Sequence, residues 1–233
     1  MQPELQSVNT NTGYGEVAAA PESQKVLRNT YLLLALTMVP TIAGAWLGMA
    51  TASVITGSPI LSFFLMLGAV IGLQFGIVHF RNSVIGIGLL LLMTGLLGWF
   101  LGPLLNYALT MQNGMQLVGY AAAGTGVIFF TMGTIATVTK RDFSFMGKFL
   151  FVGMIAVLCA AVANLFLQMP LFGLVISSLV LVVFSLYLLY DLSRIVTGGE
   201  TNYVMATTGV YLSLFNIFTS LVHILLALGG EKD

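Results

Sequence analysis

The sequence contains very few charged residues. Lysine and arginine number 8 and aspartate and glutamate 8, so charged residues are 7% of the 233-residue chain, against roughly a quarter in soluble domains. Hydrophobic residues make up 58%. This balance excludes a soluble domain and predicts an all-α membrane protein with several spans. The formal net charge of zero leaves no large basic face, so we expect no nucleic-acid partner.

Cysteine and histidine are equally scarce. Cys159 is the single cysteine, which excludes an internal disulfide and a multi-cysteine metal site. His79 and His223 are the only histidines, too few for the nitrogen ligands of a zinc hydrolase. We therefore expect neither a resident metal nor a cofactor.

The sequence also lacks the residue patterns of an enzyme. It contains neither Gly-x-Ser-x-Gly nor His-Glu-x-x-His, and no pair of intramembrane aspartates. Ser213 and His223 are ten residues apart on one predicted helix, roughly 15 Å along its axis, so they cannot form a dyad. We predict that the protein is not an enzyme.

Seven apolar runs are long enough to cross a hydrocarbon core of roughly 30 Å, which takes about 20 helical residues. They cover residues 30–53, 59–80, 83–105, 115–138, 147–168, 171–193 and 204–229. Their short connections make consecutive helices antiparallel neighbours. An even number of spans would require one run, most readily the last, to be a re-entrant segment.

The distribution of basic residues predicts the orientation. Residues 1–24 are polar with few large apolar side chains, which is typical of a flexible tail and not of a secretory signal. If the tail is cytoplasmic, seven of the eight Lys and Arg residues are cytoplasmic and only Lys232 is exterior. We therefore predict a cytoplasmic tail over residues 1–28, a seven-helix domain over 29–230 and an exterior C-terminus over 231–233.

Glycines recur at the spacing of close helix packing. They form three groups, Gly44 and Gly48, then Gly68, Gly72 and Gly76, then Gly98 and Gly102. Such spacing lets two backbones approach closely where lipid provides no hydrophobic drive for association. Packing within the bundle is the favoured interpretation, with a dimer interface as the alternative, and the sequence leaves the oligomeric state open.

Asp191 is the most informative polar residue within the apolar runs. It lies near the inner end of the sixth run, where an ionisable group faces the bundle interior or water and usually has a partner. It is a candidate proton-sensing or cation-binding group. Alternatively, it pairs with Arg194 and only anchors the helix. Arg81 ends the second run on the same side, as a candidate latch or a topology signal, and His79 precedes it.

Ser213 and Asn216 give the seventh run a polar face. Ser213 lies about 13 Å along the helix from residue 204, and Asn216 lies one turn deeper on the same face. They are candidates for lining a polar interior with Asp191. Ordinary hydrogen bonding between helices is the more common use of such residues.

Three stretches carry a family resemblance that runs from about Lys25 to Gly230. They are VLRNTYLLLALTMVPTIAGAWLG, then GLLGWFLGPLLNYAL followed by AAAGTGVIFF, and YDLSRIVTGGETNYVMATTGVYLSLFNIFTSLVHILLAL. Together they resemble the Bax inhibitor-1 family, also called the transmembrane BAX inhibitor motif family. The GGETNY string at 198–203 is similar to its bacterial branch. The resemblance implies a bundle in which six helices surround a central seventh.

The resemblance also implies an ion site. Some family members are pH-sensitive calcium leak channels gated by two aspartates on the last two helices, with an arginine latch from the second. Asp191 matches the first aspartate and Arg81 the latch, but Ser213 replaces the second aspartate in YLSLFN. Two carboxyls sharing a proton are therefore absent. One carboxylate with Asn216 and carbonyl oxygens still provides for weak Ca²⁺ binding.

The bacterial branch implies a protein partner. Its members engage FtsH, a membrane-anchored AAA protease, both as substrates and as modulators that slow the degradation of other membrane proteins. The predicted tail would supply a handle, because 24 extended residues reach on the order of 80 Å. We predict a multi-pass protein of the bacterial inner membrane that modulates FtsH. The rival interpretations are a calcium, cation or proton leak centred on Asp191 and a structural scaffold.

Overall fold

The computed structural model describes residues 21–139 and 141–229, and helices account for nearly all of these residues. The helices are α1 (Pro21–Ala50), α2 (Ala52–Thr56), α3 (Pro59–His79), α4 (Val84–Leu109), α5 (Gly114–Thr139), α6 (Met146–Leu167), α7 (Pro170–Thr197) and α8 (Tyr203–Gly229). All except the five-residue α2 are long and apolar enough to cross a membrane. The seven predicted spans and the all-α membrane fold are confirmed.

Helix α1 begins earlier than the sequence analysis predicts. Residues 21–28, assigned to the flexible tail, form its first two turns. Proline is favoured at a helix start, Glu22 suits the first turn, and the following residues are good helix formers. Val26 and Leu27 also pack against the main core. The predicted tail is therefore too long by these residues, while residues 1–20 and 230–233 lie outside the described part of the chain.

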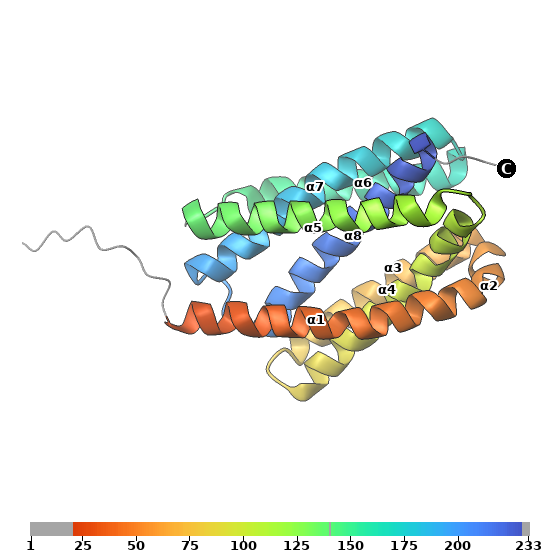
Figure 1. Ribbon diagram of the computed structural model, residues 1–233. Coiled ribbons are helices and arrows are strands. Elements are labelled where there is room, and N and C mark those ends of the chain that lie inside the picture. Colours follow the sequence, from red (N-terminus) through yellow and green to blue (C-terminus); the bar gives the residue numbers. More distant parts are fainter. Residues whose placement is uncertain (1–20, 140, 230–233) are drawn as a thin grey trace, which may run out of the picture.

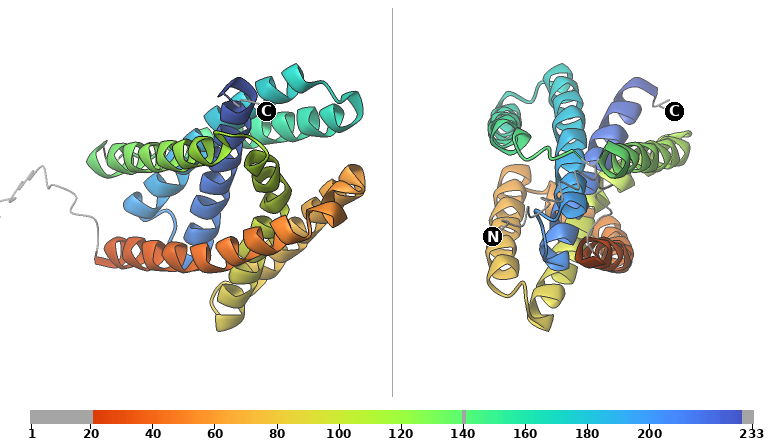
Figure 2. Two further views of the ribbon diagram at one scale, coloured as in Figure 1. Left: turned by 45° about the vertical axis from the view of Figure 1, so that its right-hand side comes forward. Right: turned by 90° about the vertical axis from the view of Figure 1, so that its left-hand side faces the viewer.

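Helix α8 runs through the middle of the bundle. Figures 1 and 2 show it crossing between α1 and α5, and it packs against α7, α5, α1, α4 and α3. Helix α6 packs mainly against α7. Eleven residues of α8 are buried, and they lie all around the helix, with Tyr211 and Ser213 on nearly opposite sides. This arrangement confirms a seven-helix bundle with α8 as its central helix, in which α6 is held mainly through α7.

Helices α1 and α4 form the closest pair, and glycines make this contact possible. A Cβ atom at Gly44 would collide with the carbonyl oxygen of Gly95, and one at Gly98 with that of Thr41. Gly48 and Gly102 meet in the same way. Two of the three predicted glycine groups therefore pack within the bundle. The third group differs, because Gly68 and Gly72 on α3 have open space beside them.

The phenol of Tyr211 connects three helices near the centre of the bundle. Tyr211 is 2% exposed. Its hydroxyl lies 2.8 Å from Thr41 Oγ1 on α1 and 3.3 Å from the carbonyl oxygen of Thr94 on α4. A buried hydroxyl without such partners would be costly in an apolar interior. These contacts fix the rotation of α8, and with it the residues that α8 presents to α7.

Candidate functional site

A polar cavity of about 140 Å³ lies between α3, α7 and α8. Its lining residues are Gln74, Asp191, Arg194, Glu200, Met205, Ala206 and Gly209. Asp191 is six residues before the end of α7 and Gly209 is six residues after the start of α8. Both therefore lie roughly 9 Å inside their helix ends. The cavity joins residues from three spans at one depth.

The Asp191 carboxyl group lies directly against the backbone of α8. Ser213 donates a hydrogen bond of 3.4 Å to Asp191 Oδ2. A Cβ atom at Gly209 would stand 2.9–3.1 Å from the three carboxyl atoms of Asp191. Glycine at this position is what lets α7 and α8 approach with the carboxyl group between them. The predicted proximity of Ser213 to Asp191 is present in the structure.

Gln74 is a cavity residue that the sequence analysis missed. It lies on α3, five residues before the helix ends. Its Oε1 atom is buried and has no hydrogen-bond partner among the described residues. An unsatisfied buried amide oxygen is costly. The available signal was a single carboxamide within the apolar run AVIGLQFGIV, which matches no motif.

Arg194 is the arginine that lines the cavity, and its ion-pair partner is Glu200. Its Nη2 atom lies 3.4 Å from Glu200 Oε2 and donates to the carbonyl oxygen of Gly199 at 3.2 Å. The guanidinium also stacks over the Tyr190 ring at 5.5 Å from the centroid. The alternative pairing of Asp191 with Arg194 is therefore replaced by a pair within the α7–α8 turn.

Asp142 adds negative charge on the same side of the molecule. It lies in the turn between α5 and α6, outside the spans, where the Ser144 backbone N–H donates to Oδ1 at 2.8 Å. Hydrogen bonds with the Ser144 side chain and backbone, followed by the charge of Arg194, lower the pKa of this carboxyl below its usual range. Arg194 therefore has acidic neighbours in two turns.

Asn202 joins the α7–α8 turn to the α3–α4 turn. Its Oδ1 atom accepts hydrogen bonds from the backbone of Val204 at 3.0 Å and Met205 at 3.1 Å, capping the start of α8. Its Nδ2 atom donates to the Arg81 carbonyl oxygen at 3.0 Å and to Asn82 Oδ1 at 2.8 Å. This side chain links the three spans around the cavity at their ends.

The predicted latch residue lies elsewhere. The Arg81 side chain is exposed in the turn after α3 and is not among the residues that line the cavity. The physical reason is depth, because Arg81 lies two residues beyond the end of α3 whereas Asp191 is roughly 9 Å inside α7. Only its backbone carbonyl contributes, through Asn202. His79 is exposed, with its ring edge against Phe80.

Asn216 does not reach the cavity either. Its Nδ2 atom donates to the Leu212 carbonyl oxygen at 2.8 Å, one turn back along α8. His223 lies on the exposed side of α8. Of the four predicted site residues, the structure thus brings Asp191 and Ser213 together and leaves Arg81 and Asn216 outside.

The chemistry available in the cavity is that of oxygen ligands and water. The described residues contain no cluster of three His, Cys, Asp or Glu side chains able to share a metal ion. Asp191, Gln74 and Glu200 supply oxygen atoms, and the volume has room for several water molecules. Water can hydrogen-bond the Gln74 oxygen, and a cation would meet two acidic side chains.

Comparison with known proteins finds one family over almost the whole chain. A sequence model described as Inhibitor of apoptosis-promoting Bax1 matches residues 23–230. A membrane protein of Vibrio cholerae is 42% identical over 204 residues, covering 88% of this chain and 90% of the relative.

Two relatives from Escherichia coli carry names that state a role or a location. The Modulator of FtsH protease YccA of strain K12 is 40% identical over 203 residues, covering 87% of this chain and 90% of the relative. The Inner membrane protein YccA of E. coli O6:H1 matches with the same identity and coverage.

Proposed function

Because this chain belongs to the Bax inhibitor-1 family and has seven helices suited to crossing a membrane, we propose that it is an inner-membrane protein that binds and modulates the protease FtsH. The observation that carries this proposal is the 40% identity, over 87% of the chain, to a protein named as a modulator of that protease. The role is regulatory rather than catalytic, in membrane-protein quality control.

The tight packing of α1 in the bundle supports the role of a modulator, because it makes the protein hard to unfold. Pulling on α1 would have to separate it from α4, where glycine backbones meet, and from α8, where Tyr211 bonds Thr41. Close backbone packing of this kind resists separation, because a densely packed contact has little room to deform before it breaks. A bundle with such packing would be unfolded and degraded slowly by the protease. It would therefore occupy the protease and slow the degradation of competing substrates.

The segment ahead of α1 would be the handle. Residues 1–20 precede the helix and are polar in sequence. Fully extended, twenty residues reach about 70 Å, enough to leave the membrane surface. We assign FtsH contact to this segment and to the helix ends beside it.

The basic residues support a cytoplasmic position for this end of the bundle. Antiparallel spans bring the start of α1 together with the α3–α4, α5–α6 and α7–α8 turns. Six described basic residues lie at these places, Lys25, Arg28, Arg81, Arg141, Lys148 and Arg194. Lysine and arginine in short loops are retained on the cytoplasmic side. The N-terminus is therefore cytoplasmic and the C-terminus periplasmic in this proposal.

An affinity pull-down tests the proposal. Tagged full-length protein and a form lacking residues 2–20 are purified side by side from native membranes in mild detergent, and partners are identified by mass spectrometry. We expect FtsH with the full-length form and much less with the shortened one. Absence of FtsH from intact full-length protein would contradict the proposal.

A second function, a proton or cation leak centred on Asp191, is supported by one observation. The cavity holds Asp191 and the Gln74 oxygen, which has no hydrogen-bond partner among the described residues, and Glu200 of the α7–α8 turn also lines it. Calcium flux into proteoliposomes tests it, with Asp191→Asn beside wild type. We expect flux that is lost in the variant. Flux that persists in Asp191→Asn would remove the carboxyl group from the pathway, whatever the result with FtsH.

A further inference from the structure

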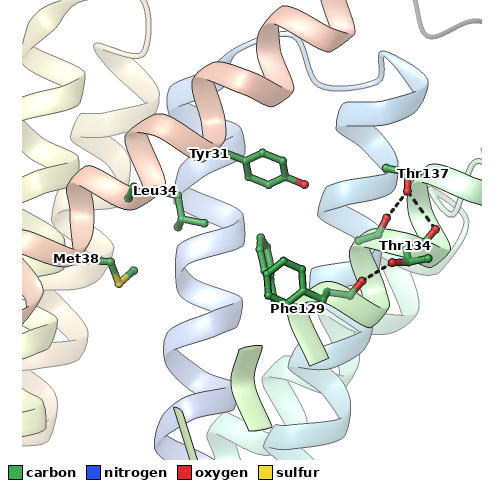
Figure 3. A pocket seen from close by; sticks show the side chains of 9 residues that line it. Tyr31, Leu34, Met38, Phe129, Thr134 and Thr137 are labelled. Atoms are coloured by element: carbon green, nitrogen blue, oxygen red, sulfur yellow. Dashed lines mark hydrogen bonds between the residues drawn. The ribbon is translucent and has the colours of Figure 1, made fainter. Parts of the chain in front are cut away.

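A second hollow, the α1–α5 groove, lies on the flank of the bundle and is not used by the functions above. It has a volume of about 520 Å³ and is lined by Tyr31, Leu34, Ala35 and Met38 of α1 and by Phe129, Phe130, Gly133, Thr134 and Thr137 of α5. Figure 3 shows the two sets of side chains facing each other across the opening. Both helices pack against α8, and Figure 1 shows them running alongside each other.

The lining of the α1–α5 groove is largely apolar, because its two threonine hydroxyls are bonded to the α5 backbone. The Thr134 hydroxyl donates to the Phe130 carbonyl oxygen at 2.8 Å, and the Thr137 hydroxyl donates to that of Gly133 at 2.8 Å. The rings of Tyr31 and Phe129 meet edge to face at 5.9 Å. The Tyr31 hydroxyl makes no hydrogen bond to the described residues and points across the opening in Figure 3. The groove therefore offers one polar tip and a hydrocarbon-like wall.

The volume of the groove favours a lipid acyl chain over a helix as its occupant. The α1 lining runs from Tyr31 to Met38, about 10 Å of helix axis, and a helix about 10 Å in diameter would occupy on the order of 800 Å³ over that length. The groove holds about 520 Å³, within the range of roughly 300–1,000 Å³ for small-ligand sites. A flexible acyl chain can lie entirely within this space, whereas a helix would lie only partly within it.

Positive charge flanks one end of the groove. Arg28 lies one turn before Tyr31 on the same face of α1, and Arg141 comes two residues after the end of α5. Both side chains are exposed, and the ion pair found within the described residues joins Arg194 and Glu200 instead. Two guanidinium groups without an ion-pair partner among the described residues, beside an apolar groove, are complementary to a phosphate joined to an acyl chain.

We propose that the α1–α5 groove binds one acyl chain of an anionic phospholipid, with its phosphate between Arg28 and Arg141 and its ester region at the Tyr31 hydroxyl. The bound lipid comes from the leaflet at the end of the bundle where α1 begins. It fills the space between α1 and α5 that side chains leave open, and it would hold the segment ahead of α1 at the membrane surface. This site does not depend on FtsH binding or on conduction.

Photo-crosslinking tests the proposal. Full-length protein is reconstituted in phosphatidylcholine bilayers that contain phosphatidylglycerol with a photoreactive acyl chain, and crosslinked peptides are mapped by mass spectrometry. We expect adducts concentrated on residues 31–38 and 129–137. Labelling spread evenly over the exposed faces of α3 and α6 would overturn the proposal.

Two sets of variants separate the groove from ordinary boundary lipid. Ala35 is exposed and lines the groove, so Ala35→Trp fills it, while Leu36→Trp adds the same side chain on a neighbouring face outside the lining. Loss of most adducts is expected in the first variant only. Equal adduct yields in both variants would overturn the groove as the site.

The charge variants keep the test valid if Ala35→Trp fails to fold. Arg28→Gln and Arg141→Gln alter exposed side chains, and each is expected to lower the preference for phosphatidylglycerol over a phosphatidylcholine probe about five-fold. Lys148→Gln, also exposed and at the same end of the bundle, is the control. An unchanged preference in the double arginine variant would overturn the assignment of the phosphate.

Discussion

At the scale of single residues, two side chains distinguish the cavity, the carboxyl group of Asp191 and the carboxamide of Gln74. Asp191 has its hydrogen bond from Ser213 and a bare α8 backbone at Gly209. Gln74 faces the same cavity without a partner among the described residues. A chain under selection for stability alone would not retain an unsatisfied amide there. These two side chains are the reason for proposing this cavity as the site of the leak.

Removing the Gln74 amide should stabilise the protein. Gln74→Leu eliminates a buried oxygen that has no partner, and we expect the free energy of unfolding to rise by about 1 kcal/mol. The measurement is unfolding by SDS in mixed micelles. Gln116→Leu, at an exposed site near the start of α5, is the control and should change little. A clear loss of stability in Gln74→Leu would mean that the oxygen holds a bound water or ion.

The arginine that controls the cavity should be Arg194, not Arg81. Arg194→Gln leaves Glu200 unpaired beside Asp191, which makes the cavity more negative and should increase any cation leak. Arg81→Gln alters an exposed side chain outside the lining and should leave flux unchanged. Calcium flux into proteoliposomes compares them. Increased flux in Arg81→Gln alone would restore the latch expected from the family resemblance.

The sequence predicts only those site residues that belong to a motif or occupy a characteristic position along a predicted helix. Asp191 and Ser213 follow from position, because a carboxyl near a span end and a hydroxyl on the next span tend to face the interior. Gln74 and the Arg194–Glu200 pair depend on how α3 rotates and how the α7–α8 turn folds back. Neither is encoded in a local pattern.

At the scale of helices, glycine decides which pairs pack tightly. Gly98→Ala places a methyl group against the Thr41 backbone, which cannot yield without moving α1. We expect a loss of about 1–3 kcal/mol in the free energy of unfolding. Gly72→Ala points into open space on α3 and should be neutral or up to about 1 kcal/mol stabilising. Equal effects of the two substitutions in SDS unfolding would contradict this account of α1 and α4.

The start of α8 depends on Asn202. Asn202→Ala removes the helix cap and both links to the α3–α4 turn, and should cost about 2 kcal/mol in the free energy of unfolding. Asn82→Ala removes one of these hydrogen bonds and should cost about 1 kcal/mol or less. Both are measured by the same titration. An Asn202→Ala protein as stable as wild type would show that the turns are held together by other contacts.

Helix boundaries were less predictable than helix number. Apolar length counts the spans because lipid demands about 20 residues from each. The start of α1 at Pro21 follows instead from the first-turn residues Pro21 and Glu22 and from the packing of Val26 and Leu27. The polar composition of this segment is compatible with either a helix or a tail. Composition alone cannot separate these two states.

At the scale of the whole molecule, the central α8 connects the regions with proposed roles. Its start is capped by Asn202, its first turns line the cavity, and its middle holds α1 through Tyr211. Helix α1 in turn places its start at the end of the bundle where the described basic residues gather. A protease that pulls from this end works against α1, α4 and α8 together.

The most direct test of the central claim is degradation in a reconstituted membrane. Purified FtsH and a fluorescently labelled membrane substrate are placed in proteoliposomes with increasing amounts of this protein or of the form lacking residues 2–20. The account predicts that the full-length protein lengthens the substrate half-life in a saturable way and that the shortened form has much less effect. A substrate half-life unchanged at saturating full-length protein would contradict it.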